Sequence, residues 1–228
     1  MNKRKYKVND DFFEVINTEE KAYILGFIAA DGNVRKKKDI NSFVLRIGLS
    51  SKDETLLKTI NTHLSNYPIR KYKTKYGFET IELSITSTKI YNDLNKLGIV
   101  ERKSLILKFP ENLPQELLPH FIRGYFDGDG SVYTYDGYIQ SRNKSYNIIQ
   151  CQIIGTKEFL TKLSEIMNFC GNQVKKETRL DTNCYKYSIT HKKRCSELYK
   201  YLYKDATIYL ERKKLIFENY FKKDVQRL

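Results

Sequence analysis

One apolar pattern occurs twice in this chain: Ala22-Tyr23-Ile24-Leu25-Gly26-Phe27-Ile28-Ala29-Ala30-Asp31-Gly32 and His120-Phe121-Ile122-Arg123-Gly124-Tyr125-Phe126-Asp127-Gly128-Asp129-Gly130. Both copies end in Asp-Gly, and in each copy small residues recur about one helical turn apart. Helices with small residues on one face can approach more closely than helices with bulky ridges. The sequence therefore predicts two buried helices that pack against each other.

The Asp-Gly ends predict where the two helices stop. Gly32 and Gly130 occupy the position at which a helix favours a left-handed residue, so we expect Asp31 and Asp129 at the helix C-termini. Two carboxylates that converge there would repel each other and the negative ends of the helix dipoles. A divalent cation relieves this repulsion, and hard oxygen ligands favour Mg²⁺ completed by a substrate phosphate.

The residues Ile24 to Gly32 and Ile122 to Gly130 resemble the two motifs of LAGLIDADG homing endonucleases in their double-motif, single-chain form. The resemblance implies that the motif helices form the interface between two pseudo-symmetric halves. It also implies that Asp31 and Asp129 are catalytic and bind metal, Mg²⁺ with Mn²⁺ as a substitute. The sixth motif position is Asp127 in the second copy but Ala29 in the first, which indicates asymmetry between the halves.

Periodicity along the chain predicts an α+β fold of two αββαββα repeats with antiparallel sheets. The resemblance implies that the repeats are pseudo-symmetric about a central two-helix interface and that the sheets are DNA-binding. The repeats are expected over 1–108 and 119–228, joined by a linker at 109–118 that contains Phe109-Pro110-Glu111-Asn112-Leu113-Pro114. In the first repeat, Ser51-Lys52-Asp53-Glu54 predicts a capping box before a helix that ends near residue 66. The expected strands are 33–38, 42–50, 68–75, 78–86, 131–139, 146–154, 173–179 and 184–190, and the other expected helices are 88–97, 157–169, 193–203 and 209–221.

A second pair of matching segments follows the two motifs. Val100-Glu101-Arg102-Lys103-Ser104-Leu105-Ile106 recurs as Leu210-Glu211-Arg212-Lys213-Lys214-Leu215-Ile216, in the same order relative to the motif. An amphipathic helix with solvated charges would also explain these segments. In the resembled family a basic residue downstream of each motif belongs to the active site, and Lys103 and Lys213 match best, with Arg102 and Lys214 as alternatives. An ammonium group there could stabilise charge on the phosphate or hold the attacking water.

Composition points to a polyanionic partner. The formal net charge is +14 over 228 residues, and it is spread along the chain. Lysine enrichment from an A/T-rich genome is the alternative explanation. The sequence has no membrane-length apolar run and no signal-peptide pattern at its N-terminus, so we expect a soluble, intracellular protein that does not bind membranes. Four cysteines without C-x-x-C spacing are expected to be reduced.

The predicted sheets supply candidate DNA contacts, because an antiparallel sheet can bury one face and present the other to a groove of the duplex. Arginine can bond guanine and glutamine can bond adenine through two hydrogen bonds each. Some of the basic residues are expected to contact phosphates only. The candidates are Arg46, Ser50, Arg70, Tyr72, Lys73, Lys75, Gln150, Gln152, Lys175, Lys176, Arg179 and Lys186.

These patterns together predict a monomeric, site-specific double-strand DNA endonuclease that hydrolyses phosphodiesters with a divalent metal at a long asymmetric target. The sequence contains no G-x-S-x-G, P-loop or H-E-x-x-H motif that would support another chemistry. Two alternatives remain open. One is an RNA maturase that assists splicing of a host intron RNA, which 18 tyrosines would suit. The other is a DNA-binding protein that does not cleave.

Overall fold

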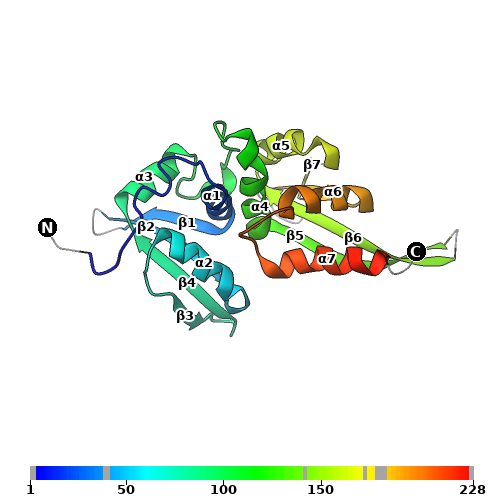
Figure 1. The fold of residues 1–228 in the computed structure, drawn as a ribbon, viewed down its shortest axis with the longest axis horizontal. Coiled ribbons are helices and arrows are strands. Elements are labelled where there is room, and N and C mark those ends of the chain that lie inside the picture. The colour runs from blue at the N-terminus through cyan, green and yellow to red at the C-terminus, as the bar shows by residue number, and fades with distance from the viewer. Residues whose placement is uncertain (1–3, 38–41, 141–142, 172–173, 178–183, 226–228) are drawn as a thin grey trace. The chain divides into compact units, whose positions relative to one another are not determined.

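The computed structural model describes residues 4–37, 42–140, 143–171, 174–177 and 184–225 (Figure 1). By their contacts the residues form two compact units. The first unit comprises Met1–Lys103 and Pro110–Gly128, and the second comprises Ser104–Phe109 and Asp129–Leu228. None of the described helices combines the length and the apolar character needed to cross a membrane. The predicted division of the sequence into two repeats joined by a linker at 109–118 stays a prediction, because the compact units are defined by contacts and not by repetition of the sequence.

The first unit contains two motif helices and one sheet. Its antiparallel strands have the order β1-β2-β4-β3. Within each antiparallel pair, partners lie on the same face, so the buried positions Leu45, Ile47, Ile81, Leu83 and Ile85 form one continuous apolar face. The elements are α1 (Glu19–Asp31), β1 (Gly32–Lys36), β2 (Phe43–Ser50), α2 (Glu54–Leu64), β3 (Arg70–Lys73), β4 (Glu79–Thr86), α3 (Thr88–Lys96) and α4 (Leu118–Asp129).

The second unit repeats the sheet topology of the first. Its strands have the order β5-β6-β8-β7, again with antiparallel pairing throughout. The elements are β5 (Gly130–Ile139), β6 (Lys144–Gly155), α5 (Lys157–Ile166), β7 (Val174–Lys176), β8 (Tyr185–Ile189), α6 (Lys192–Tyr203) and α7 (Glu211–Val225). The order of helices and strands confirms the predicted α+β fold of two αββαββα repeats with antiparallel sheets.

The first motif helix begins as the sequence predicts. Thr18 is its N-cap and accepts a hydrogen bond from the Lys21 N–H at 3.4 Å, while Glu19 and Glu20 lie in the first turn near the positive end of the dipole. Residues 22–29 are all buried, so α1 is apolar around its circumference and belongs to the core. Burial from neighbouring elements, rather than an exposed polar face, therefore stabilises this helix.

The predicted left-handed glycine at the end of each motif helix is wrong. Gly32 has φ −72° and ψ 146°, an extended conformation, and β1 starts there. Gly130 is also absent from the described glycines with positive φ, which are Gly77, Gly98 and Gly171. At position 32, space is what requires glycine, because a Cβ would lie 2.5 Å from Ile28 Cγ2 and 2.7 Å from Ile28 O.

The capping box predicted before α2 is also wrong. Ser51, Lys52 and Asp53 form a 3₁₀ turn, and Ser50 caps this turn by accepting a hydrogen bond from the Lys52 N–H at 3.4 Å. Asp53 is the N-cap of α2 without a side-chain cap bond. The helix itself is confirmed, because Leu56, Leu57, Ile60 and Leu64 are buried at helical spacing. The four cysteines are free thiols, as expected, and three of them are buried.

Candidate active site and nucleic-acid interface

The two motif helices touch through their backbones within the first unit. A Cβ built on Gly26 would lie 2.0 Å from Phe121 O, and a Cβ built on Gly124 would lie 2.0 Å from Tyr23 O. In the alignment of the two motifs, Gly26 matches Gly124 and Tyr23 matches Phe121. The two contacts are therefore related by a local twofold. This confirms the predicted close packing, which leaves no room for a methyl group at either glycine.

Each motif helix ends in an exposed aspartate. Asp31 and Asp129 are the last residues of α1 and α4, and both are exposed although the residues before them are largely buried. A Cβ on Gly128 would lie 3.4 Å from Asp31 Oδ2 and 2.3 Å from Ala30 Cβ. The carboxylate of Asp31 is thus next to the residue that precedes Asp129 in the chain. The predicted position of both acids at a helix C-terminus is what the structure has.

Lys103 reaches the end of the first motif helix from a 3₁₀ turn over Lys103–Leu105. Its Nζ donates to Ala30 O at 3.0 Å and to Gly32 O at 2.6 Å, the carbonyls on either side of Asp31. The residue is only 7% exposed, which is rare for a lysine and requires bonded partners. The backbone at the helix end thus fixes an ammonium group next to the backbone of Asp31.

Lys213 makes the matching contact in the second unit. It lies in the first turn of α7, is 3% exposed, and donates from Nζ to Gly130 O at 2.5 Å. Gly130 corresponds to Gly32, so both lysines bond the carbonyl that follows the motif aspartate. Neither alternative occupies this position. Arg102 is exposed with φ 58°, and Lys214 lies 4.0 Å from the centroid of the Tyr209 ring.

The donor set at each helix end fits a hard divalent cation only in part. Among the described residues, no group of three or more His, Cys, Asp or Glu side chains could hold a metal ion. Each unit offers one exposed carboxylate beside a helix C-terminus, whose partial negative charge favours cations. Mg²⁺ commonly takes one or two carboxylates and fills its remaining positions with waters and phosphates, so the acids suit it.

The outward face of the first sheet carries several predicted DNA contacts. Arg46 pairs with Ser84 across β2 and β4, and Arg70 and Tyr72 pair with Glu82 and Thr80 on the same face. Arg70 and Tyr72 are exposed, and Arg46 is half-buried. Within the described part of the chain, Arg46 Nε is a buried atom without a hydrogen-bond partner. This face therefore presents two guanidinium groups and an aromatic ring.

Other predicted contacts of the first repeat lie elsewhere. Lys73 pairs with Glu79 on the opposite face of the sheet, and its Nζ is 3.9 Å from the Glu79 carboxylate. Ser50 is exposed, but its hydroxyl caps the following 3₁₀ turn. Lys75 is exposed in the β3–β4 turn, where its Nζ lies 4.9 Å from the centroid of the Tyr76 ring.

The second sheet presents a different set of side chains. Gln152 pairs with Ser188 and Ser131, as Arg46 pairs with Ser84 and Asn33, so it occupies the position equivalent to Arg46. Gln150 and Gln152 are half-buried on the outward face. On the neighbouring strands Lys175 pairs with Lys186, whose Nζ is 3.1 Å from the Glu177 carboxylate, and Lys176 is exposed. Arg179 lies outside the described residues.

Two tyrosines on this face were not predicted as contacts. Tyr133 pairs with Gln150, and Tyr135 pairs with Ile148, so both are on the outward face of the β5–β6 ribbon. They are 41% and 43% exposed, and their ring centroids are 6.1 Å apart. The ribbon runs alongside α7 and extends past α6 (Figure 1). The alternation of tyrosines in residues 133–135 is the signal that sequence reasoning could have used.

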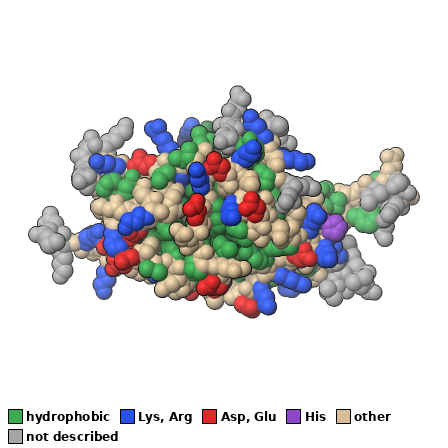
Figure 2. Space-filling model, turned by 90° about the horizontal axis from the view of Figure 1, so that it is seen from above, with side chains coloured by type: hydrophobic (Ala, Val, Ile, Leu, Met, Phe, Trp, Pro, Cys, Tyr) green, Lys and Arg blue, Asp and Glu red, His purple; other side chains and the backbone are tan. Residues whose placement is uncertain are grey.

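Basic side chains are not gathered into one patch on the visible face. Figure 2 shows lysines and arginines spread over it and interspersed with aspartates and glutamates. On this face, the basic residues are therefore spread out, as they are along the sequence.

Comparison with known proteins agrees with this geometry. The LAGLIDADG-like domain family matches residues 18–98 and again 116–202. The LAGLIDADG meganuclease I-CpaMI, solved bound to uncleaved DNA, has a TM-score of 0.63 at 15% identity over 91% of this chain and 90% of its own. I-AabMI, also bound to uncleaved DNA, has a TM-score of 0.62 at 14% identity over 90% of each chain.

One curated relative matches a smaller part of the sequence. The DNA-directed RNA polymerase subunit Rpo1C of Methanocaldococcus jannaschii is 28% identical over 113 residues, which are 48% of this chain and 12% of that protein. The two LAGLIDADG-like domains together cover most of the chain, and each contains a motif helix and a four-stranded antiparallel sheet. A buried lysine bonded at the end of a motif helix follows each matched range, Lys103 after the first and Lys213 after the second. The chain belongs to the LAGLIDADG-like domain family and carries two copies of that domain in one polypeptide.

Proposed function

We propose that this protein is a site-specific endonuclease that cuts both strands of a long, asymmetric DNA target with the help of Mg²⁺. One observation carries the proposal. Each unit has an exposed aspartate at the end of a motif helix, and a buried lysine bonded to the carbonyl of the following glycine. A repeat that served only as a scaffold would have no need to bury two lysines at these two places.

Phosphodiester hydrolysis needs an in-line water, relief of the charge that develops on the phosphate and stabilisation of the leaving 3′ oxygen. When bound, Mg²⁺ supplies Lewis acidity for both the attacking and the leaving oxygen. Asp31 and Asp129 are the residues that would hold it. Their carboxylates would also accept hydrogen bonds from water and so orient the nucleophile. Mn²⁺ is expected to substitute for Mg²⁺.

In this mechanism the two lysines stabilise the negative charge that develops on the phosphate. Each ammonium group is fixed beside a motif aspartate by bonds to backbone carbonyls, Lys103 to Ala30 and Gly32 and Lys213 to Gly130. A positive charge held in place before the reaction stabilises negative charge on the phosphate without reorganisation. It also offsets the negative end of the motif helix dipole.

The outward faces of the two sheets would bind the duplex. Arg46 and Arg70 on the first sheet suit guanine or phosphate, whereas Gln150 and Gln152 on the second sheet suit adenine. Because the two faces differ in chemistry, the two half-sites are expected to differ in sequence. A single-chain protein has no need of a palindromic site, in contrast to a homodimer of identical halves.

Selection of cleaved duplexes from a randomised pool in Mg²⁺ tests this function. We expect a long, non-palindromic consensus and cleavage of both strands by a monomer. A palindromic consensus would contradict the assignment of different half-sites to the two sheets. Tight binding without cleavage in either Mg²⁺ or Mn²⁺ would instead identify a DNA-binding protein that does not cut.

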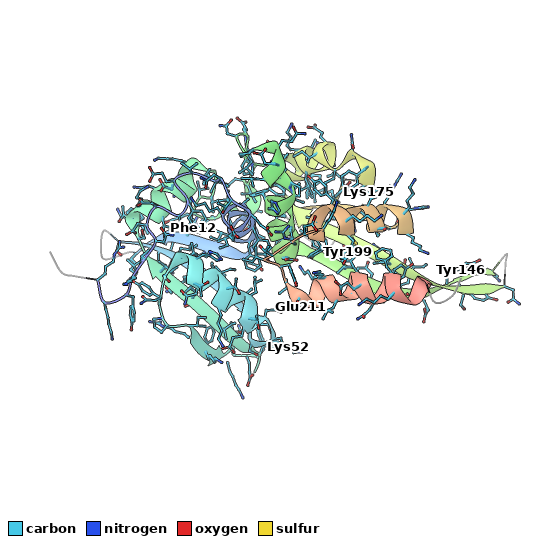
Figure 3. All side chains as sticks on the ribbon, in the orientation of Figure 1. Phe12, Lys52, Tyr146, Lys175, Tyr199 and Glu211 are labelled. Atoms are coloured by element: carbon cyan, nitrogen blue, oxygen red, sulfur yellow. The ribbon has the colours of Figure 1, made fainter. Side chains whose placement is uncertain are left out.

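Replacement of the buried lysines should separate chemistry from binding. We expect Lys103→Met and Lys213→Met each to slow the chemical step by about 100-fold, because a preorganised charge is lost, with little change in DNA affinity. Single-turnover cleavage and filter binding measure the two effects. Lys52→Met, at an exposed lysine of the first unit, is the control (Figure 3). Equal losses of rate and affinity would make the lysines phosphate anchors.

The charge of the protein predicts a strong salt dependence of binding. Each neutralised phosphate of duplex DNA contributes about 0.9 to the slope of log affinity against log salt concentration. A protein with a net charge of +14 spread along its chain should neutralise several phosphates, so affinity should fall steeply between low and moderate salt. Fluorescence anisotropy with a fixed duplex measures the slope. A slope near zero would exclude the duplex backbone as the main partner.

The exposed tyrosine pair favours RNA as a second candidate partner. Unpaired bases stack on aromatic rings, and Tyr133 and Tyr135 offer two adjacent rings on one face. An RNA maturase that assists splicing of its host intron would use such a surface. Tyr133→Ala with Tyr135→Ala should then reduce binding to the intron RNA more than binding to the cleaved duplex.

A further inference from the structure

The polar contacts between the two motif helices do not follow the local twofold that relates their backbones. Arg123 on α4 is fully buried, and its Nη2 donates to Glu19 Oε1 on α1 at 2.6 Å. One turn along, the Tyr23 hydroxyl on α1 donates to Asp127 Oδ2 on α4 at 2.8 Å, and Asp127 is 1% exposed. We call Glu19, Tyr23, Arg123 and Asp127 the interface quartet.

Neighbouring groups reinforce the interface quartet. The Arg123 guanidinium carbon lies 5.3 Å from the centroid of the Tyr23 ring, and Arg123 Nη1 is 3.0 Å from His120 Nδ1. Burial and the nearby guanidinium lower the pKa of His120, which keeps the imidazole neutral and able to accept this hydrogen bond. Burial and Asp127 raise the pKa of Tyr23, so the phenol keeps its proton for Asp127.

The local twofold identifies the residues that are equivalent by symmetry to the four residues of the interface quartet. In the motif alignment Arg123 matches Leu25 and Glu19 matches Leu117, while Asp127 matches Ala29 and Tyr23 matches Phe121. The local twofold therefore relates each polar pair to an apolar pair: Arg123 and Glu19 correspond to Leu25 and Leu117, and Asp127 and Tyr23 correspond to Ala29 and Phe121. Arg123 and Asp127 are both on α4, and their partners are both on α1.

Pairing of a motif helix with a copy of itself would break both polar contacts. Two copies of α4 would place Arg123 against Leu117 and Asp127 against Phe121, so each charge would lose the partner that it has on α1, Glu19 for Arg123 and Tyr23 for Asp127. Two copies of α1 would bury Glu19 near Leu25 without a cation. A buried charge that loses its partner is strongly destabilising, whereas apolar pairs tolerate either arrangement.

We infer that the interface quartet determines which motif helix pairs with which: it makes α1 complementary to α4 and makes each helix incompatible with its own copy. Its partner selectivity is the intramolecular equivalent of buried polar residues that fix register and partner in coiled coils. The chain is thereby kept as a unit of two different halves. This inference is independent of the endonuclease function.

Charge reversal in the full-length chain tests the selectivity. Glu19→Arg places two arginines at the Glu19–Arg123 contact, and Arg123→Glu places two glutamates there, so each variant alone should have a lower denaturation midpoint. When the two variants are refolded together, α1 of one chain and α4 of the other are complementary in both directions. We expect a mixed dimer of twice the chain mass by light scattering and native mass spectrometry.

The double variant Glu19→Arg/Arg123→Glu restores opposite charges within one chain and should be a monomer with a midpoint above that of either single variant. Reversal of the exposed Lys108–Glu158 pair, 3.5 Å apart in the second unit, is the matched control and should give no mixed dimer. Wild-type midpoints for both single variants would overturn the inference. Absence of a mixed dimer together with no recovery in the double variant would overturn it as well.

Discussion

We expect Asp31→Asn and Asp129→Asn each to reduce cutting of both strands by about a thousandfold or more, with DNA affinity close to that of the wild type. A thousandfold loss corresponds to about 4 kcal/mol of transition-state stabilisation. The amide keeps the size of the carboxylate but removes the charge that holds a divalent cation. Both aspartates are exposed at helix ends, so the substitution should change folding stability little.

Single-turnover cleavage in Mg²⁺, with gel-shift affinity measured in Ca²⁺, separates the two quantities. Asp11→Asn, at an exposed aspartate of the N-terminal segment that forms an ion pair with Lys89, is the control for removal of a surface charge. Full cutting of both strands by either site variant would refute the metal assignment of that aspartate. Loss of binding in parallel with cutting would show that the acid acts on assembly of the complex.

A single added methyl group at the helix contact is expected to destabilise the fold strongly. In Gly26→Ala or Gly124→Ala, the new Cβ would meet a backbone carbonyl oxygen at 2.0 Å, and neither backbone can move without separating the helices. We expect a loss of about 3 kcal/mol or more in the free energy of unfolding, at the upper end of overpacking effects. Urea denaturation followed by circular dichroism measures it.

Gly48→Ala is the matched control for this substitution. Gly48 lies in β2, and its nearest neighbour to a built Cβ is Ile81 O at 4.0 Å. The same chemical change should therefore be nearly neutral there or slightly stabilising, because alanine restricts the unfolded chain. If the three alanine variants had the same stability, the close backbone contact between α1 and α4 would be wrong.

The sequence was sufficient to predict the helices and strands but not the structural role of every residue in them. Long apolar segments with repeated small residues predict buried helices, because no other arrangement covers such a surface. The role of Gly32 was misjudged, since the Asp-Gly signal is shared by left-handed helix ends and by glycines that lack space for a side chain. Only the position of Ile28 distinguishes these two cases.

The repeated segments identify Lys103 and Lys213 as candidates but do not predict their structural surroundings. Lys103 lies in a 3₁₀ turn and Lys213 in a regular helix, so the local structure of the two matching segments differs. Their bonds to Gly32 and Gly130 span 71 and 83 residues of sequence. Such contacts depend on tertiary packing, and the repeat predicted the residues without predicting that burial and carbonyl bonds would hold them.

The sheet faces were predictable where the strands alternate in polarity and unpredictable elsewhere. In β4, alternation assigns Ile81, Leu83 and Ile85 to the core, as observed. The strand β3 reads Arg-Lys-Tyr-Lys and is exposed throughout, so only its register with β4 places Arg70 and Lys73 on opposite faces. The polar network of Arg123 was also missed, because a charged residue inside an apolar motif gives no indication of its partner.

The pairing of α1 with α4 has a consequence for synthesis of the chain on the ribosome. The first motif helix is complete at Asp31, and its partner begins at Leu118, so the two are separated by nearly the whole first repeat. At about 5 to 20 residues per second, this interval lasts roughly 5 to 20 s. During that time the apolar residues Ala22–Ala29, all buried in the finished protein, lack their covering helix. The nascent chain therefore passes through a stage in which its most hydrophobic helix is the segment most in need of a chaperone.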